Sequence, residues 1–198
     1  MKKLAQPTRN HDMRGIHMKK ILTVFIFIFL AGLFSGVFYS TGLSAENTDR
    51  LSELILSASA SPPSGFIHSL LSFFRVNMLM LLLMLPAVFT KYLCPVPPLL
   101  LWYRCFSAGF CSGIIYIRDP GHALMVSLVK IIPQNIFFIP AFIMFAAVTF
   151  TYSVSGTFTQ KRNRVTLPPG TLKLSSAAAF AAVCAGSITG ALLSQISV

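Results

Sequence analysis

The chain has 198 residues, of which 55% are hydrophobic and only 11% are charged, and its mean hydropathy is +0.73. This composition leaves too little polar surface to cover a water-soluble globule, so it excludes an ordinary soluble domain and indicates a membrane protein. The net charge of +11 does not indicate a nucleic-acid-binding protein, because the basic residues stand beside apolar runs and are not interleaved with aromatic residues.

Five stretches are apolar and long enough to cross a bilayer, for which about 20 residues are needed. In chain order they cover residues 21–39, 69–89, 98–117, 122–153 and 174–193. We expect each to be helical, because lipid offers the backbone no hydrogen-bonding partner outside the chain itself. The predicted fold is therefore an all-α integral membrane protein, a bundle of about five transmembrane helices.

The fourth stretch is interrupted by prolines and amide side chains. Pro133 and Pro140 each lack a backbone donor, and Gln134 and Asn135 follow the first of them directly. A helix through these positions should kink or start anew, with the amides able to bond the freed carbonyls. We therefore predict that the fourth helix is broken at Pro133 and Pro140. In one layout residues 121–132 lie at the outer membrane surface and the crossing begins near Pro133, a favourable first-turn residue.

The positions of lysine and arginine predict the orientation. Six basic residues precede the first span, Lys91 lies between the second and third, and four lie between the fourth and fifth. Because cytoplasmic segments carry an excess of basic residues, we place the N-terminus inside and the C-terminus outside. The opposite side then keeps only Arg50 and Arg118. The chain divides into a basic cytoplasmic tail, residues 1–20, and a single membrane domain, residues 21–198.

The first span is interpreted as a retained anchor. Its apolar run of about 19 residues is longer than that of a cleavable signal peptide, and Leu43 stands where a small residue would be expected before Ala45. The sequence Met-Lys-Lys occurs at positions 1 and 18, so Met1 and Met18 both stay open as the start of translation.

Two loops contain much of the polar sequence. The outer loop, residues 40–68, holds a polar cap followed by apolar residues at helical spacing, which predicts a short amphipathic helix on the outer surface. That helix is either an ordered turn over the bundle or a partner-binding element. The inner loop, residues 154–173, is basic and is interpreted as a topology signal with a modest contribution from contact with anionic lipid heads.

Pairs of glycines at GxxxG spacing occur on three spans that are expected to run in the same direction. The pairs are Gly32 and Gly36, Gly109 and Gly113, and Gly186 and Gly190. This spacing places both glycines on one helix face, where a neighbouring backbone can approach closely. Any one pair is weak evidence, but three favour a compact bundle with glycine-lined helix contacts.

The sequence offers no clear catalytic, metal or cofactor site. No acidic residue lies in the middle of an apolar run, the cysteines lack CxxC spacing, the histidines do not cluster, and no phosphate-binding glycine loop occurs. The sharpest catalytic alternative is an intramembrane serine protease that uses Ser112 and His122. Its rhomboid-type signature requires glycine where Phe110 stands, and His122 follows on a different predicted element. We therefore predict no enzyme activity, no metal, no cofactor and no nucleic-acid partner.

The motif IPQNIFFIPA at residues 132–141, preceded by LWYRCFSAGF at residues 101–110 and by the glycines of the first span, resembles the stage II sporulation protein M family. The resemblance extends over residues 18–198, and its most specific part is the Pro-Gln-Asn block. Wider relatives of that family carry Pro-His-Gly and then Glu before the second proline. Here Gln134, Asn135 and Phe138 stand at those places, so a proton-linked role does not carry over.

The resemblance implies a multi-pass subunit of a complex in the mother-cell or septal membrane of endospore-forming bacteria. Its partners would be stage II sporulation proteins D and P, which cut peptidoglycan while the mother cell engulfs the forespore. This chain would then be their non-catalytic scaffold, with membrane lipid around it. The residues expected to serve structure or partner contact are Pro133, Gln134, Asn135, Pro140, Arg104, Gly32, Gly36, Gly109, Gly113, Gly186 and Gly190.

The alternative function is a permease-like subunit of a membrane transporter. A broken fourth span would line the substrate path, and Arg75, Arg104 and Lys130 would face a water-filled cavity. Otherwise these three basic residues lie near the ends of their spans and extend to the membrane interface.

Overall fold

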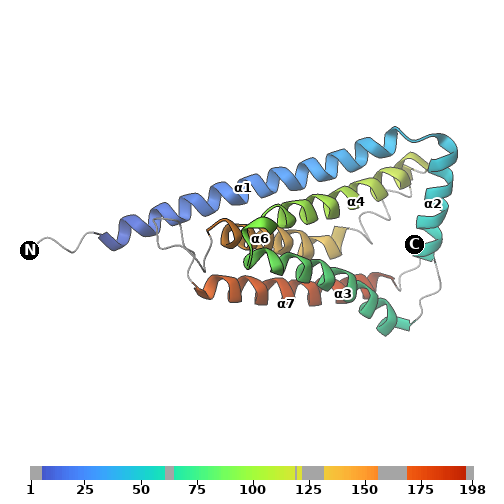
Figure 1. Cartoon of the computed structure of the whole chain (residues 1–198). Coiled ribbons are helices and arrows are strands. Elements are labelled where there is room, and N and C mark those ends of the chain that lie inside the picture. The colour runs from blue at the N-terminus through green and yellow to red at the C-terminus, as the bar shows by residue number, and fades with distance from the viewer. Residues whose placement is uncertain (1–5, 61–64, 119, 122–131, 156–168, 195–198) are drawn as a thin grey trace, which may run out of the picture.

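The computed structural model describes residues 6–60, 65–118, 120–121, 132–155 and 169–194, and all regular structure in these ranges is helical (Figure 1). The α-helices are α1 (Gln6–Thr41), α2 (Ala45–Ala60), α3 (Gly65–Met84), α4 (Val96–Arg118), α6 (Ile132–Ser155) and α7 (Pro169–Ser194). Two short 3-10 helices, η1 (Leu85–Val88) and η2 (Lys91–Leu93), connect α3 to α4.

Five helical segments of the described chain are long and apolar enough to cross a membrane. They are Met18–Thr41, Gly65–Val88, Lys91–Arg118, Asn135–Val154 and Gly170–Leu193. The prediction of an all-helical, multi-pass membrane protein is therefore confirmed. The start of α1 and the end of α7 lie at opposite ends of the bundle, as an odd number of crossings requires (Figure 1).

The helix α1 is longer than its apolar stretch. It begins at Gln6 and extends through most of the predicted tail, so that its first turns project beyond the other helices (Figure 1). Once the apolar span has nucleated a helix, adding further residues to its end is much easier than starting a new one. The tail is thus largely an extension of the first membrane helix.

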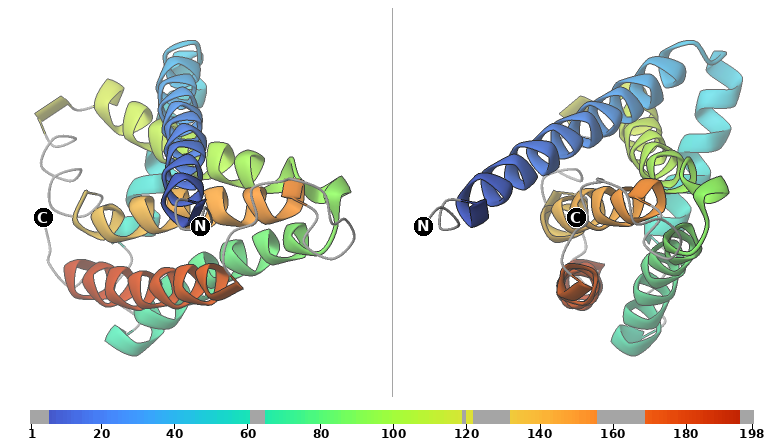
Figure 2. Two further views of the ribbon diagram at one scale, coloured as in Figure 1. Left: turned by 90° about the vertical axis from the view of Figure 1, so that its left-hand side faces the viewer. Right: turned by 60° about the vertical axis from the view of Figure 1, so that its left-hand side comes forward.

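The helix α6 forms the centre of the bundle. It lies between α4 and α7 in both views of Figure 2, and α1 and α3 also contact it. Of its apolar stretch 61% is buried, against 17% to 33% for the other four spans. Large aromatic and very small residues share its buried surface, including Phe138, Phe142, Phe145, Ala146 and Ala147. The core therefore depends on α6 more than on any other described helix.

The predicted break at Pro140 is not confirmed. The helix α6 begins at Ile132, so Pro133 lies in its first turn, but Pro140 lies inside a helix that continues to Ser155. Proline removes only one backbone donor, and neighbouring helices make such a loss tolerable within a membrane. Residues 122–131, which make up most of the predicted surface segment and include Lys130, lie outside the described residues, as does most of the basic inner loop.

Candidate functional site

The most closely packed feature of the described chain is the contact between α1 and α4. A Cβ added at Gly32 would lie 2.7 Å from the carbonyl oxygen of Trp102 and 3.0 Å from the Cβ of Cys105. A Cβ added at Gly36 would collide with the carbonyl oxygen of Phe106. Both glycines of α1 therefore lie directly against the α4 backbone, where no side chain fits.

The glycines of α4 make the reciprocal contacts. A Cβ at Gly109 would collide with the carbonyl oxygen of Leu33, and a Cβ at Gly113 would collide with the Oγ of Ser40. The Ser40 hydroxyl is itself buried and donates to the carbonyl of Val37. Two GxxxG motifs that lie far apart in the sequence thus face each other, which is the arrangement that close backbone approach requires.

The register of these contacts gives the relative direction of the two helices. Gly32 lies beside Trp102, Gly36 beside Phe106, and Ser40 beside Gly113. Residue numbers increase together along both helices, so α1 and α4 run parallel. This agrees with the expectation that the first and third spans cross in the same direction.

Aromatic rings border this contact on α4. The rings of Trp102, Phe106 and Phe110 stack in sequence, with centroids 5.3 Å and 6.1 Å apart. Tyr39 of α1 lies 5.9 Å from both phenylalanine rings. Such contacts add roughly 0.5–1.5 kcal/mol per pair beyond the burial of area. The rings therefore fix the rotation of α1 against α4 as well as its distance.

The third glycine pair packs differently from the other two. A Cβ at Gly186 of α7 would lie 2.8 Å from the ring of Phe138 of α6, and Gly190 is buried on the same helix. Here glycine makes room for an aromatic side chain instead of a backbone. Phe138 is only 2% exposed, so the position at which wider relatives carry glutamate is part of the apolar core in this chain.

The rest of the Pro-Gln-Asn block lies at the start of α6. Pro133 and Asn135 are half-buried, and Asn135 interacts with another residue of the chain. The side chain of Gln134 lies outside the described residues. The position of the block at a helix start agrees with the first-turn role that the sequence predicts for Pro133.

Arg104 lies in the interior and pairs with an amide of α3. Its guanidinium donates to Oδ1 of Asn77 over 3.4 Å, and Nδ2 of Asn77 donates to the carbonyl of Phe73 over 2.8 Å. Asn77 is 2% exposed. A polar link therefore joins α3 to α4. Nothing in the sequence alone indicates that Asn77 is the partner of Arg104.

Arg75 and Arg104 lie well inside their membrane-length segments, which does not favour the alternative that places these residues near the span ends. Arg75 is the eleventh of the 24 residues in Gly65–Val88, and Arg104 is the fourteenth of the 28 in Lys91–Arg118. The expected spans began at residues 69 and 98, whereas the helical segments start several residues earlier. At 1.5 Å per residue, Arg75 is about 15 Å along the helix from Gly65, and Arg104 is about 12 Å from the start of α4 at Val96.

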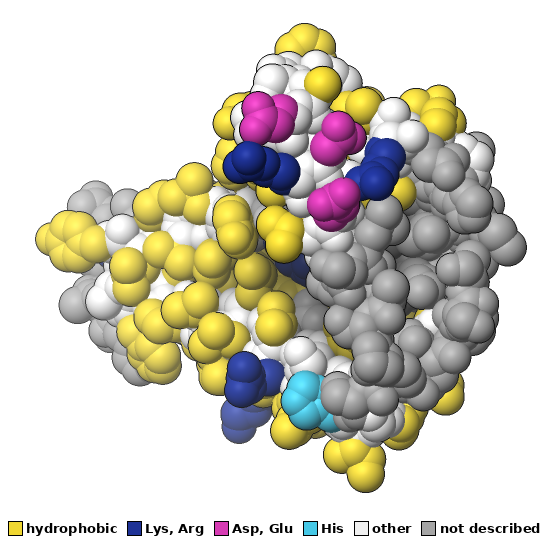
Figure 3. Space-filling view, turned by 90° about the vertical axis from the view of Figure 1, so that its right-hand side faces the viewer, with side chains coloured by type: hydrophobic (Ala, Val, Ile, Leu, Met, Phe, Trp, Pro, Cys, Tyr) yellow, Lys and Arg dark blue, Asp and Glu magenta, His cyan; other side chains and the backbone are white. Residues whose placement is uncertain are grey.

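At the C-terminal end of α4, a surface contact holds α2, the helix that the sequence predicts to be amphipathic. The guanidinium of Arg118 donates to Oγ of Ser52 over 2.6 Å and to the carbonyl of Asp49 over 3.5 Å. Ser52 is fully buried in this contact. The exposed surface of α2 carries acidic side chains, which lie together in the upper part of the face in Figure 3. Among them, Glu46 forms a 3.0 Å ion pair with Arg50.

Of the two residues in the protease alternative, Ser112 is half-buried on α4 and His122 lies outside the described residues. Within the described ranges, no three His, Cys, Asp or Glu side chains come together as a metal site would require.

Comparison with known proteins identifies the chain. Neither the curated proteins nor the solved structures contain a match. The protein-family model for stage II sporulation protein M matches residues 24–193, which include all five membrane-length segments except the first turns of one. The chain therefore belongs to the stage II sporulation protein M family.

Proposed function

We propose that this protein is a non-catalytic membrane scaffold that assembles or localises peptidoglycan-degrading partners during forespore engulfment. Membership of the family implies a role in stage II of sporulation. The proposed partners are stage II sporulation proteins D and P, and the proposed location is the mother-cell or septal membrane.

The observation that carries the proposal is that the glycines and the buried polar residues of the bundle serve contacts between helices. The glycines of α1 and α4 serve backbone packing, Asn77 and Arg104 join two helices, and Phe138 is buried against Gly186. These are interactions that hold membrane helices in fixed positions. A bundle of fixed geometry is what a scaffold needs in order to present a constant surface to its partners.

The distribution of charge supports a cytoplasmic N-terminus. Lys19, Lys20, Lys91 and Lys173 lie at one end of the bundle, while Arg50 and Arg118 lie at the other (Figure 1). The end with more basic residues is expected on the cytoplasmic side. Reporter fusions should place residues 1–20 and the η2 segment inside, and Val198 and α2 outside. A C-terminal reporter that reads as cytoplasmic would contradict this orientation.

Co-purification tests the scaffold role directly. The tagged protein would be isolated from sporulating cells in a mild detergent, and its partners identified. Recovery of proteins D and P is the expected result, whereas recovery of an ATPase subunit in their place would favour the permease-like alternative.

Two glycine substitutions make a matched pair for the same experiment. Gly109→Leu should reduce recovery of the partners, because the new side chain meets the α1 backbone. Gly170→Leu should not, because no atom lies within 4 Å of a Cβ at that position. Equal recovery with both variants would show that the α1–α4 contact is not needed for assembly.

A further inference from the structure

Arg75 is an exposed arginine at the middle of a membrane-spanning helix. It lies near the centre of the segment Gly65–Val88, and its side chain is exposed on the surface of the bundle. Within the described residues it has no hydrogen-bond or ion-pair partner. A charged group at this depth is costly, and such residues pair with an opposite charge, face water or mark a functional site.

The membrane-length segments of the described chain contain no acidic residue that could pair with Arg75. Its five acidic residues all lie outside the membrane-length segments: Asp12, Glu46, Asp49, Glu53 and Asp119. The nearest amide along α3, Asn77, already accepts from Arg104. A second copy of this chain would bring no acidic residue to that depth either. A carboxylate that pairs with Arg75 at that depth would therefore come from a different molecule.

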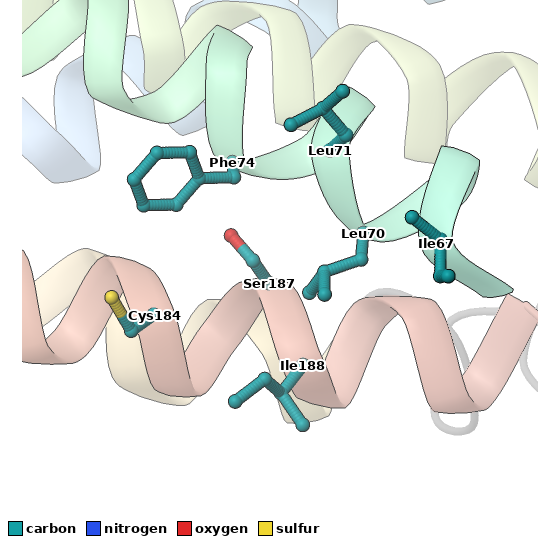
Figure 4. Close-up of a pocket in the computed structure, with 7 residues that line it drawn as sticks. All are labelled: Ile67, Leu70, Leu71, Phe74, Cys184, Ser187 and Ile188. Carbon is teal, nitrogen blue, oxygen red and sulfur yellow. The ribbon is translucent and has the colours of Figure 1, made fainter.

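An apolar groove lies between α3 and α7 (Figure 4). Its volume is about 290 Å³, and Ile67, Leu70, Leu71 and Phe74 line its α3 side. These four residues follow the i, i+3, i+4, i+7 spacing of one helix face. Arg75 directly follows Phe74 and lies one helical turn beyond Leu71, so helical spacing places it next to the end of the α3 face that lines the groove.

The α7 side of the groove contains an unsatisfied hydroxyl. Cys184, Ser187 and Ile188 line this side, and Figure 4 shows the oxygen of Ser187 directed toward α3. The Ser187 side chain is fully buried, and its Oγ has no hydrogen-bond partner in the part of the chain that the structure describes. A buried polar group without a partner is unfavourable, so this hydroxyl adds nothing to the preference of the groove for apolar side chains.

We infer that α3 and α7 bind a membrane-spanning helix of another protein that carries a carboxylate near its middle. The carboxylate pairs with Arg75, and apolar side chains on the outer half of that helix fill the groove. The groove is too small to enclose a helix but suits side chains of one lying across its mouth, as ridges pack into grooves. An acyl chain could fill the same space, but it could not neutralise Arg75. This inference rests on the proposed function, since it defines the surface by which the scaffold holds one partner.

Designed helices in vesicles test the pairing. The full-length protein would be reconstituted in phosphatidylcholine vesicles with a polyleucine helix of about 20 residues. That helix would carry Glu or Leu at its centre, and energy transfer between fluorophores would report association. The Glu helix should bind roughly tenfold more tightly than the Leu helix, in line with polar contacts between membrane helices.

Variants of the protein identify the residue responsible. Arg75→Leu should abolish the preference for the Glu helix, and Arg75→Lys should retain it. Arg50→Leu is the matched control, because it removes the same charge from an exposed residue on α2, outside the membrane-length segments. Equal binding of the two helices to the unaltered protein would overturn the inference. So would binding of neither, or an Arg75→Leu effect that appears only with anionic lipid and so places Arg75 at a headgroup.

Co-purification separates this inference from the proposed function. If the unaltered protein recovers proteins D and P and Arg75→Leu recovers them equally well, the inference is wrong and the scaffold role stands. If the unaltered protein recovers neither, the proposed function is wrong, and the vesicle experiment alone decides whether Arg75 binds an acidic helix.

Discussion

The α1–α4 contact predicts a specific order of damage from the smallest possible substitution, glycine to alanine. At Gly36 and Gly109 the added methyl group would collide with a backbone carbonyl oxygen of the facing helix, which cannot move unless the helices separate. At Gly32 the nearest carbonyl oxygen is 2.7 Å away, so a smaller shift relieves the contact. Gly36→Ala and Gly109→Ala should therefore destabilise the bundle more than Gly32→Ala.

Overpacking of this kind costs about 1–3 kcal/mol per site. Gly36 and Gly109 lie in the same contact. Once one methyl group has moved the helices apart, the second methyl group therefore causes a smaller further loss of stability. We expect the double variant to lose less than the sum of the two single variants. Alanine is otherwise the better helix former by about 1 kcal/mol. At Gly170, where a Cβ meets nothing within 4 Å, the same change should leave stability unchanged or raised.

Thermal unfolding of the purified protein in mild detergent measures these differences. The expected ranking of midpoints has Gly170→Ala at or above the unaltered protein, Gly32→Ala below it, and Gly36→Ala and Gly109→Ala lowest. If Gly36→Ala and Gly109→Ala unfold at the same midpoint temperature as the Gly170→Ala control, the α1–α4 contact does not limit stability. The prediction from backbone collision is then wrong.

Three further predictions concern single contacts. Gly113→Ala meets the Ser40 hydroxyl and not a carbonyl, so adding Ser40→Ala should restore part of the lost thermal stability; no recovery would mean that the backbone, and not the hydroxyl, limits the approach. Phe138→Glu should lower stability by at least about 3 kcal/mol, because it removes a core ring and buries a carboxyl, and normal thermal unfolding would refute the core assignment. Asn77→Leu should cost about 1 kcal/mol by leaving Arg104 without its acceptor, measured by the same assay; an increase in stability would show that the link is dispensable.

The sequence by itself determined the class of fold and the length of its elements. Runs of apolar residues fix where helices cross, because a membrane imposes one length and requires internal backbone hydrogen bonds. The spacing of Gly32 and Gly36, and of Gly109 and Gly113, also indicated that close contacts exist. These are local properties, which neighbouring residues decide without reference to the rest of the chain.

Only the tertiary structure decided which surfaces meet. Glycine spacing does not name the facing helix, so the pairing of α1 with α4, and of Gly186 with a ring, could not be read from the motifs. The contact between Asn77 and Arg104, which are 27 positions apart, could not be read from the sequence either. The apolar run of the second span indicates a start near residue 69, whereas α3 begins at Gly65, so Arg75 lies further inside the helix than the run alone indicates. Contacts between distant segments depend on the summed fit of whole helix faces, and no stretch of sequence contains that information alone.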